Sequence, residues 1–415
     1  MKGAKRVREV VLDSASSWVG VDPGRTPAST MVLKLFNDLV VTGALESAIS
    51  PGAGRRVLRG HIQGEDGSYF LLACESNVVA GSIFIPHRGS FQIHYSGSGI
   101  HSIIESDPAQ LPPCGVQNGA FKGTKPGLFK AAEMEVQKNQ AEVVAGAKMP
   151  VVDILVIYTA QARDGAGGQA GIDTLIDLAV AEANMVYQNS QVNLFLHLAK
   201  SAKVTYEESG NLADDLARLI NPRDGYLDEV GALRTNCHAD LVCMIVENST
   251  PQSGFDLTGI AVQTANATNA FSVVQRYFAT GSYVFAHELG HNFGCQHDRA
   301  DANSPGIYHY SYGNVFQAQG WTYGTVMSYP GQRIPHFSNP NVSFLGAPTG
   351  IGDAAINAAD NARTLNLRAA TVAGFCSPSG STYAPTVSIS NPRNNAVLFT
   401  RSNIVVSANA AETGG

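Results

Sequence analysis

The sequence carries little charge and no long hydrophobic run. Charged residues make up 15% of its 415 residues, against roughly a quarter in an average soluble domain, and the net charge is -6. No basic block is dense enough to follow a phosphate backbone, which argues against a nucleic-acid partner. No stretch reaches the about 18 apolar residues that a membrane-spanning helix needs, so we expect a soluble chain without a membrane span.

Other signals are missing or scarce. Residues 1–13 are basic but lack the apolar segment and cleavage site of a signal peptide, so no export signal is visible in this sequence. No internal repeat is evident, and calcium-binding GGxGxDxxx repeats are absent. Cysteine is infrequent, but its even count permits disulfide bonds and an oxidising compartment. The six are Cys74, Cys114, Cys237, Cys243, Cys295 and Cys376.

The first third of the chain has a β-rich pattern followed by a polar segment. Short apolar runs separated by Gly, Asp and Ser indicate a small antiparallel β domain over residues 1–116. Residues 117–148 are rich in Ala, Lys and Gln, with a weak helical pattern, and we interpret them as an exposed, cleavable connector. The apolar runs lie at 31–36, 69–74 and 78–85.

Residues 149–377 alternate β and α patterns. A nearly continuous β-branched run at 151–158 predicts a strand covered on both faces, and the apolar spacing at 172–187 predicts a helix. We therefore expect the α/β or α+β class, with a mixed sheet. Further expected elements are strands at 192–204, 239–246 and 259–263, the last an edge strand, and helices at 212–220 and 271–293.

The segment HELGHNFGCQHD has the spacing of a catalytic metal site. His287 and His291 lie four residues apart, so on a helix their rings project from one face and can share a metal ion. Gly294 can adopt a positive φ, end the helix and bring His297 back as a third ligand. Three neutral nitrogens leave a position open, as in catalytic zinc sites, and Glu288 can move a proton there. The alternative is a helix with three surface or capping histidines.

The motif HExxHxxGxxHD resembles that of the metzincin zinc peptidases, and Asp298 after the third histidine resembles their adamalysin (reprolysin-like) branch. The resemblance implies one catalytic zinc ion and a Met-turn beneath it. The segment GTVMSY fits the Met-turn, with Met327 as the apolar floor. Tyr329 resembles the tyrosine that astacin-like and serralysin-like members use as a mobile zinc ligand and oxyanion donor; a buried tyrosine bonded to the backbone is the alternative.

The flanking segments YSYG, RIP and FSNPNV resemble the bacterial peptidyl-Asp metalloendopeptidases, over about residues 150–376. That family is associated with cleavage on the amino side of Asp and related acidic residues. Such a preference implies a cation in the pocket just past the scissile bond. Arg333, soon after the Met-turn, is our candidate, and an ordinary surface arginine is the alternative.

The segment PPCGV around Cys114 resembles the cysteine switch of metzincin pro-domains. A thiolate bound to the zinc would take the place of the nucleophilic water and keep the enzyme latent. The alternative is a disulfide between Cys74 and Cys114. With Cys114 on the metal, the four remaining cysteines would form two bridges whose pairing the sequence does not rank.

Past residue 377 the composition changes again. Residues 377–384 read as a linker, and strands at 385–390 and 403–408 resemble the first two of a bacterial immunoglobulin-like module. Such a sandwich needs about seven strands, so residues 378–415 look like a truncated module.

These observations predict a secreted, monomeric zinc endopeptidase, made as a latent zymogen and activated by another protease. Its partners would be protein or peptide substrates, held in extended form along the edge strand at 259–263. The alternative is a zinc-binding extracellular adhesion or effector protein without general proteolytic activity.

Overall fold

The structure is a computed structural model that describes residues 3–11, 30–117, 149–247, 257–376, 386–391 and 407–411. The expected connector over 117–148 lies outside these residues except for its first residue, and so does the expected linker before residue 386. None of the helices in the described ranges is both long and apolar enough to span a bilayer.

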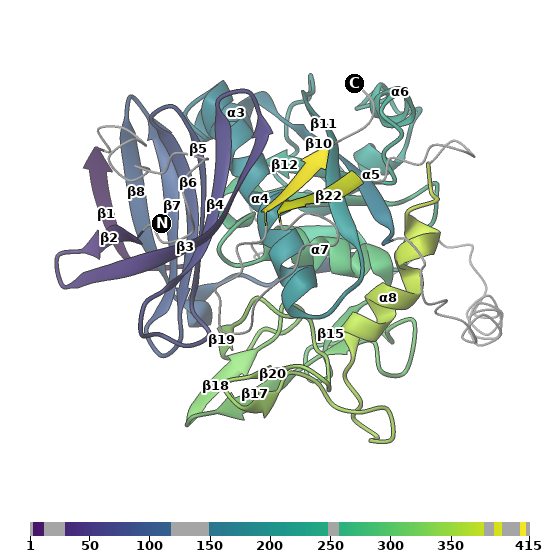
Figure 1. The fold of residues 1–415 in the computed structure, drawn as a ribbon. Coiled ribbons are helices and arrows are strands. Elements are labelled where there is room, and N and C mark those ends of the chain that lie inside the picture. Colours follow the sequence, from purple (N-terminus) through teal and green to yellow (C-terminus); the bar gives the residue numbers. More distant parts are fainter. Residues whose placement is uncertain are drawn as a thin grey trace.

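The N-terminal β domain is one eight-stranded antiparallel sheet, in the order β1-β8-β7-β6-β5-β4-β3-β2 (Figure 1). Its two edges meet, because Arg8 of β1 donates to the carbonyls of Lys34 and Leu35 on β2, and Arg6 pairs with Asp38 at 2.7 Å. The strands are β1 (Ala4–Val11), β2 (Thr30–Phe36), β3 (Leu39–Gly52), β4 (Arg55–Ile62), β5 (Tyr69–Glu75), β6 (Val78–Ile85), β7 (Gly89–Gly97) and β8 (Ile100–Ser106).

The second domain is built on a mixed sheet in the order β11-β10-β12-β14-β13, with β9 added beyond β13. Strands β11, β10, β12 and β14 are parallel, and β13 is antiparallel to β14. The strand expected at 259–263 is present as β13, but it is not at the edge of the sheet, because β9 pairs with its outer side. The elements are β9 (Gly115–Gln117), β10 (Val151–Tyr158), α3 (Ala160–Gly165), α4 (Gln169–Asn189), β11 (Phe195–Lys203), α5 (Leu212–Ile220), α6 (Val230–Asn236), β12 (Leu241–Val246), β13 (Gly259–Val262), β14 (Phe271–Gln275), η2 (Arg276–Phe278) and α7 (Val284–Phe293).

The prediction of one long helix over 271–293 is wrong. Its first five residues form β14, which is fully buried between β12 and β13, and only Val284–Phe293 are α-helical. The apolar residues at 271–275 satisfy helical spacing, but FSVVQ is also rich in residues that favour a strand, and the sheet offers it two partners. Gly281, with φ of +72°, separates the strand from the helix.

The segment after α7 lies below the mixed sheet in the view of Figure 1, has little regular structure, and ends with the helix α8. Its short strands are β15 (Gln296–Asp298), β16 (Tyr312–Gly313), β17 (Val315–Ala318), β18 (Trp321–Gly324), β19 (Gln332–Arg333), β20 (Ser343–Phe344) and β21 (Ala347–Pro348), before α8 (Asn361–Val372). A short 3-10 helix, η1 (Pro108–Gln110), precedes β9. At the C-terminal end, β22 (Thr386–Asn391) pairs antiparallel with β23 (Ser407–Ala411). Of the second predicted strand, over 403–408, only residues 407 and 408 are described, and both belong to β23.

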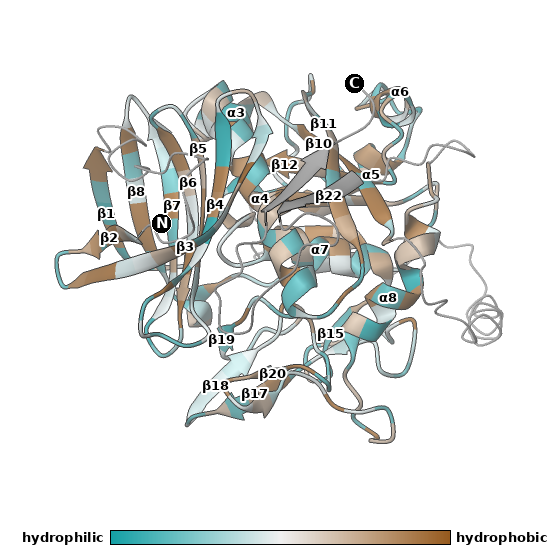
Figure 2. Cartoon of the chain, in the orientation of Figure 1, coloured by the Kyte–Doolittle hydropathy of each residue, from teal (hydrophilic) through white to brown (hydrophobic). Residues whose placement is uncertain are grey.

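The two domains share a large hydrophobic cluster, in addition to a cluster of their own in each. Helix α4 packs against β5 and β6 on one side and against the mixed sheet on the other. Hydrophobic residues concentrate on the strands of both sheets (Figure 2). Tyr69 and Phe84 of the N-terminal domain belong to the same buried cluster as Met185 and Tyr187 of α4. Burial of this kind makes the N-terminal domain an integral part of the molecule described here, rather than a loosely tethered module.

Candidate active site

Helix α7 supplies the first two histidines and a glutamate, and the turn after it returns the third histidine. Gly294, at φ of +99°, ends the helix, and its N–H bonds to the carbonyls of Gly290 and His291. A Cβ on Gly294 would lie 2.7 Å from Ile307, so a side chain is excluded there on two grounds. The chain then enters β15, which carries His297 back beneath the helix.

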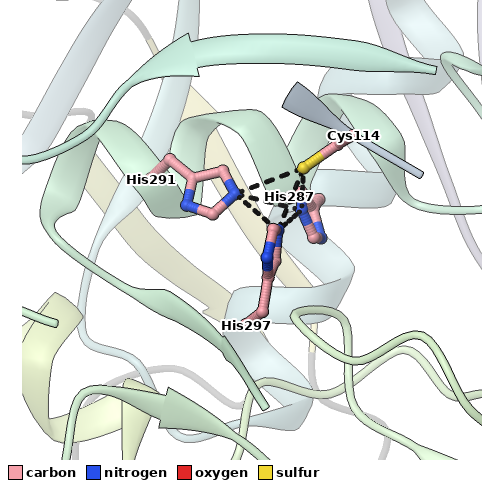
Figure 3. Close-up of side chains that lie close together, drawn as sticks. All are labelled: Cys114, His287, His291 and His297. Atoms are coloured by element: carbon pink, nitrogen blue, oxygen red, sulfur yellow. Dashed lines mark hydrogen bonds between the residues drawn. The ribbon is translucent and has the colours of Figure 1, made fainter. Parts of the chain in front are cut away.

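The three imidazoles and the Cys114 sulfur point toward a common centre (Figure 3). The Nε2 atoms of His287, His291 and His297 lie 3.1–3.2 Å from one another. The Cys114 Sγ lies 3.0, 3.5 and 3.0 Å from them, in that order. A tetrahedron with Zn–N bonds of about 2.0–2.1 Å and a Zn–S bond of about 2.3 Å has edges of about 3.3–3.6 Å. The four atoms therefore form a cage of the size that fits one zinc ion.

Hydrogen bonds of the Nδ1 atoms of His287 and His291 determine that their Nε2 atoms face the cage. His287 Nδ1 donates to the Val326 carbonyl at 2.8 Å, and His291 Nδ1 donates to the Cys295 carbonyl at 2.9 Å. These bonds leave the Nε2 lone pairs for a metal. Burial lowers the pKa of all three histidines, with the neighbouring rings adding to the effect at His287 and His297. The rings are consequently neutral, as metal ligands must be.

Cys114 reaches the cage because its segment is attached to the edge of the mixed sheet. Strand β9 pairs in parallel with β13, and the Thr258 N–H donates to the Pro113 carbonyl at 2.9 Å. Burial, then the Glu288 carboxyl, raises the pKa of the Cys114 thiol well above its usual value. A divalent cation in the cage has the opposite effect, because it binds the thiolate directly.

Glu288 lies one residue after the first histidine and is completely buried, and burial raises the pKa of its carboxyl well above the usual range. Among the described residues, neither of its oxygens has a hydrogen-bond partner. Gly259 of β13 lies directly against it: a Cβ there would come within 2.5 Å of Oε1 and 2.8 Å of Cγ. Strand β13 thus needs a glycine at position 259 to make room for the Glu288 carboxylate.

Met327 and Tyr329 lie on two sides of the cage. Met327 is fully buried, and a Cβ on Gly290 of α7 would come within 2.8 Å of its sulfur, so this helix position needs a glycine. The Tyr329 hydroxyl lies 3.1 Å from His297 Nε2 and 3.2 Å from the Cys114 sulfur, and it accepts the Cys114 N–H at 3.0 Å. The hydroxyl is therefore at the metal cage, not only in a backbone contact.

Asp298 has a structural role that the sequence did not reveal. Its side chain accepts the N–H of Ala300 at 3.2 Å and the N–H of Tyr329 at 3.3 Å. The residue thus ties the strand of the third histidine to the turn that carries Tyr329. Its position next to His297 was visible in the sequence, but its partner 31 residues away was not.

Arg333 is not an ordinary surface arginine. Its Nε donates to the Ser328 carbonyl at 3.0 Å and its Nη1 to the Ser282 carbonyl at 2.9 Å. The guanidinium carbon lies 5.9 Å from the centre of the Tyr329 ring. Burial lowers its pKa, but an arginine stays protonated, so a positive charge is held beside the cage.

The structure contains no disulfide among the six cysteines, all of which are described. The alternative of a Cys74–Cys114 bridge is wrong, because Cys74 lies in the core of the N-terminal domain while Cys114 is at the cage. The expectation of two bridges among the other four is not met either. Cys243 and Cys295 are completely buried in separate elements, whereas Cys237 and Cys376 both donate to the Arg234 carbonyl, at 3.6 and 3.9 Å.

Comparison with known proteins agrees with this geometry. The family model for metallo-peptidase family M12 (Reprolysin_5) matches residues 149–338. A peptidyl-Asp metalloendopeptidase of Stenotrophomonas maltophilia (strain R551-3) is 33% identical over 318 residues, which cover 75% of this chain and 72% of that protein. One of Xanthomonas campestris pv. campestris is 32% identical over 309 residues, covering 74% of this chain and 69% of that protein. The chain belongs to the peptidyl-Asp metalloendopeptidases of family M12.

Membership in this family confirms the predicted enzyme class and cofactor. This metalloendopeptidase uses one zinc ion, and the Cys114, His287, His291 and His297 group could bind it. The same result removes the support for a zinc-binding adhesion or effector protein that lacks proteolytic activity. Its substrates are proteins or peptides, as expected of a peptidase.

Proposed function

We propose that this chain is the latent form of a zinc endopeptidase that cleaves peptide bonds on the amino side of acidic residues, Asp above all. The observation that carries the proposal is the Cys114 sulfur at the fourth corner of the cage formed by the three histidines. A catalytic zinc site keeps that corner open for water and substrate. With the sulfur in place, the four side chains would occupy all four positions around a zinc ion, leave none for water, and so block hydrolysis.

The same segment also blocks the substrate path. Strand β9 occupies the outer edge of β13, the edge along which an extended peptide would add as a further strand. Residues 1–116 therefore act as a pro-domain in this proposal, and cleavage in residues 117–148 by another protease starts its removal. The division of the chain at residues 116, 148 and 377 remains a prediction.

In the active enzyme, His287, His291 and His297 would hold the zinc ion, which would supply a Lewis acid beside the scissile carbonyl. Glu288 takes a proton from the attacking water and passes it to the leaving amine. The Tyr329 hydroxyl donates to the oxyanion that develops on the carbonyl oxygen. Met327 supports the histidines from below.

The preference for an acidic residue is assigned to Arg333. Two main-chain carbonyls hold its Nε and Nη1, and among the described residues Nη2 makes no hydrogen bond. The Nη2 N–H groups are free to bind a carboxylate, for which a guanidinium is the best-matched cation. Arg333 also lies near Tyr329, so a side chain bound there belongs to a residue next to the scissile bond.

The test replaces Arg333 with Met, which keeps the stem but removes the charge. For two peptides that differ only in Asp or Asn after the scissile bond, we expect the ratio of kcat/KM values to fall about 10- to 100-fold. Arg234 is the matched control, since it also donates to two main-chain carbonyls, of Ala239 and Asp240. An unchanged ratio in Arg333→Met, with Arg234→Met behaving alike, would refute the assignment.

We further propose that the enzyme acts outside the cell. The fixed Cys114 contact supports this, because an enzyme that accepts many sequences must stay inactive until it has left the cell that makes it. Detection of the chain and of caseinolytic activity in the culture medium, not in the cell fraction, is the expected result.

A further inference from the structure

In the loop that precedes α7, one residue is held in a backbone conformation that its residue type does not favour. Gly281 has φ of +72° and Tyr283 has φ of +58°, so two residues of three are left-handed. A glycine adopts this conformation readily, whereas for tyrosine it is unfavourable. Tyr283 is also the N-cap of α7, and no side chain caps that end of the helix. Contacts from outside the loop must therefore hold it in place.

Glu182 of α4 makes one of the contacts that hold the loop; others come from the N-terminal domain, where Tyr69 donates to the Tyr283 hydroxyl at 2.9 Å and Gln92 to the Ser282 hydroxyl at 3.4 Å. Both of its carboxylate oxygens accept the Gly281 N–H, at 2.9 and 3.2 Å. The side chain is 1% exposed, and burial raises its pKa to about 7. Ser82 and Tyr69 of the N-terminal domain and the Gly281 N–H lower its pKa and so partly offset the effect of burial. A buried carboxylate is costly, and nothing in the mechanism proposed above uses it.

The residue that follows Gly281 connects the loop to the proposed specificity residue. The Ser282 carbonyl accepts from Arg333 Nη1 at 2.9 Å, while the Ser328 carbonyl accepts from Nε. These two carbonyls are the only anchors of the guanidinium among the described residues. If the Gly281–Ser282 segment shifts, one of the two anchors moves with it, and the guanidinium loses its orientation.

We propose that Glu182 is a positioning residue for acidic-residue specificity: by binding the Gly281 N–H it fixes the Ser282 carbonyl, which in turn orients Arg333 toward the substrate carboxylate. The inference rests on the proposed role of Arg333 and adds to it a residue on a different element. Glu182 touches neither substrate nor metal in this account. Glu182 acts on the substrate indirectly, through the Gly281–Ser282 segment and the hydrogen bond that Arg333 donates to the Ser282 carbonyl.

The experiment compares three variants of the full-length chain after activation by limited proteolysis. Glu182→Met removes the acceptor, Glu182→Gln keeps one acceptor oxygen, and Glu182→Asp keeps the charge but is too short to reach Gly281. Asp177→Met is the matched control, because Asp177 is a buried carboxylate on the same helix that pairs with Arg55 at 3.1 Å and not with the loop. The readout is the Asp-to-Asn ratio of kcat/KM values for the peptide pair used with Arg333.

We expect Glu182→Met and Glu182→Asp to lower this ratio about tenfold, mainly through the KM for the Asp peptide, with the Asn peptide cleaved within about threefold of the parent rate. Glu182→Gln should restore the ratio, and Asp177→Met should leave it unchanged. If Glu182→Met does not fold, Glu182→Asp carries the same comparison.

Three outcomes overturn the inference and are distinguishable. A normal ratio in both Glu182→Met and Glu182→Asp, while Arg333→Met lowers it, refutes the role of Glu182 and leaves the function of Arg333 intact. An unchanged ratio in Arg333→Met refutes both. A fall in the ratio that is equal in Asp177→Met also contradicts the inference, because it would point to general loosening of α4.

Discussion

The activated Glu288→Gln variant is expected to hydrolyse casein and peptides about 10²- to 10⁴-fold more slowly than the parent, with its zinc content unchanged. Gln has nearly the same shape as Glu, so the collision-free fit against Gly259 is kept. The amide cannot take up the proton of the attacking water. Initial rates and metal analysis on the same samples separate the loss of the base from a loss of the ion.

The substitution by Gln is chosen because Glu288 is buried, so that only a side chain of nearly the same shape fits its site. Glu288 has no exposed surface, and its replacement by a larger or charged side chain would disturb both α7 and β13. A Gln variant that cleaves at the parent rate would mean that the base lies elsewhere. A slow variant that has also lost zinc would leave the catalytic role of Glu288 unsupported.

The uncleaved Cys114→Ala variant is expected to show at least about tenfold more peptidase activity than the uncleaved parent. Removal of the sulfur opens the fourth corner of the cage, whereas the zinc keeps its three histidines. Activity should remain below that of the processed enzyme, because β9 still pairs with β13. Rates are measured with a short peptide, under conditions in which residues 118–148 stay intact on a gel.

Cys74→Ala is the control for this experiment. Cys74 is also a buried cysteine of the N-terminal domain, but it lies in that domain's own core. Its loss should lower the melting temperature without releasing activity. Equal activation by both variants would show that weakening the domain is sufficient, and a latent Cys114→Ala variant would contradict the cysteine switch.

The sequence revealed the metal site because all of its zinc ligands but one lie in a single short segment. Helical spacing places His287 and His291 on one face, and Gly294 permits the turn that returns His297. Cys114 could be recognised only by resemblance, since no local rule connects it to a helix 173 residues later. The same limit explains why the role of Asp298 was not seen.

The errors in the fold arose where local pattern and tertiary context disagree. Residues 271–275 satisfy a helical and a strand pattern equally, and only the presence of β12 and β13 on either side selects the strand. Most strands of the N-terminal domain were not predicted individually, because their alternation is broken by glycines and bulges. The depth of Arg333 and the contact of Glu182 with Gly281 depend on packing between distant elements, which has no signature in the sequence.

Cysteine counting also proved a weak guide. An even number of cysteines permits bridges, but Cys114 lies at the cage and none of the six is bonded to another. Pairing of this kind depends on the separation of the Cα atoms, which sequence spacing does not give.

The most direct test of the account measures metal and activity together on the processed enzyme. One zinc ion per chain is predicted, with activity that is lost on dialysis against a chelator, returns in proportion to added zinc, and is absent from the His291→Ala and His297→Ala variants. Active enzyme that contains no metal, or a His297→Ala variant that binds zinc and cleaves casein like the parent, would contradict it.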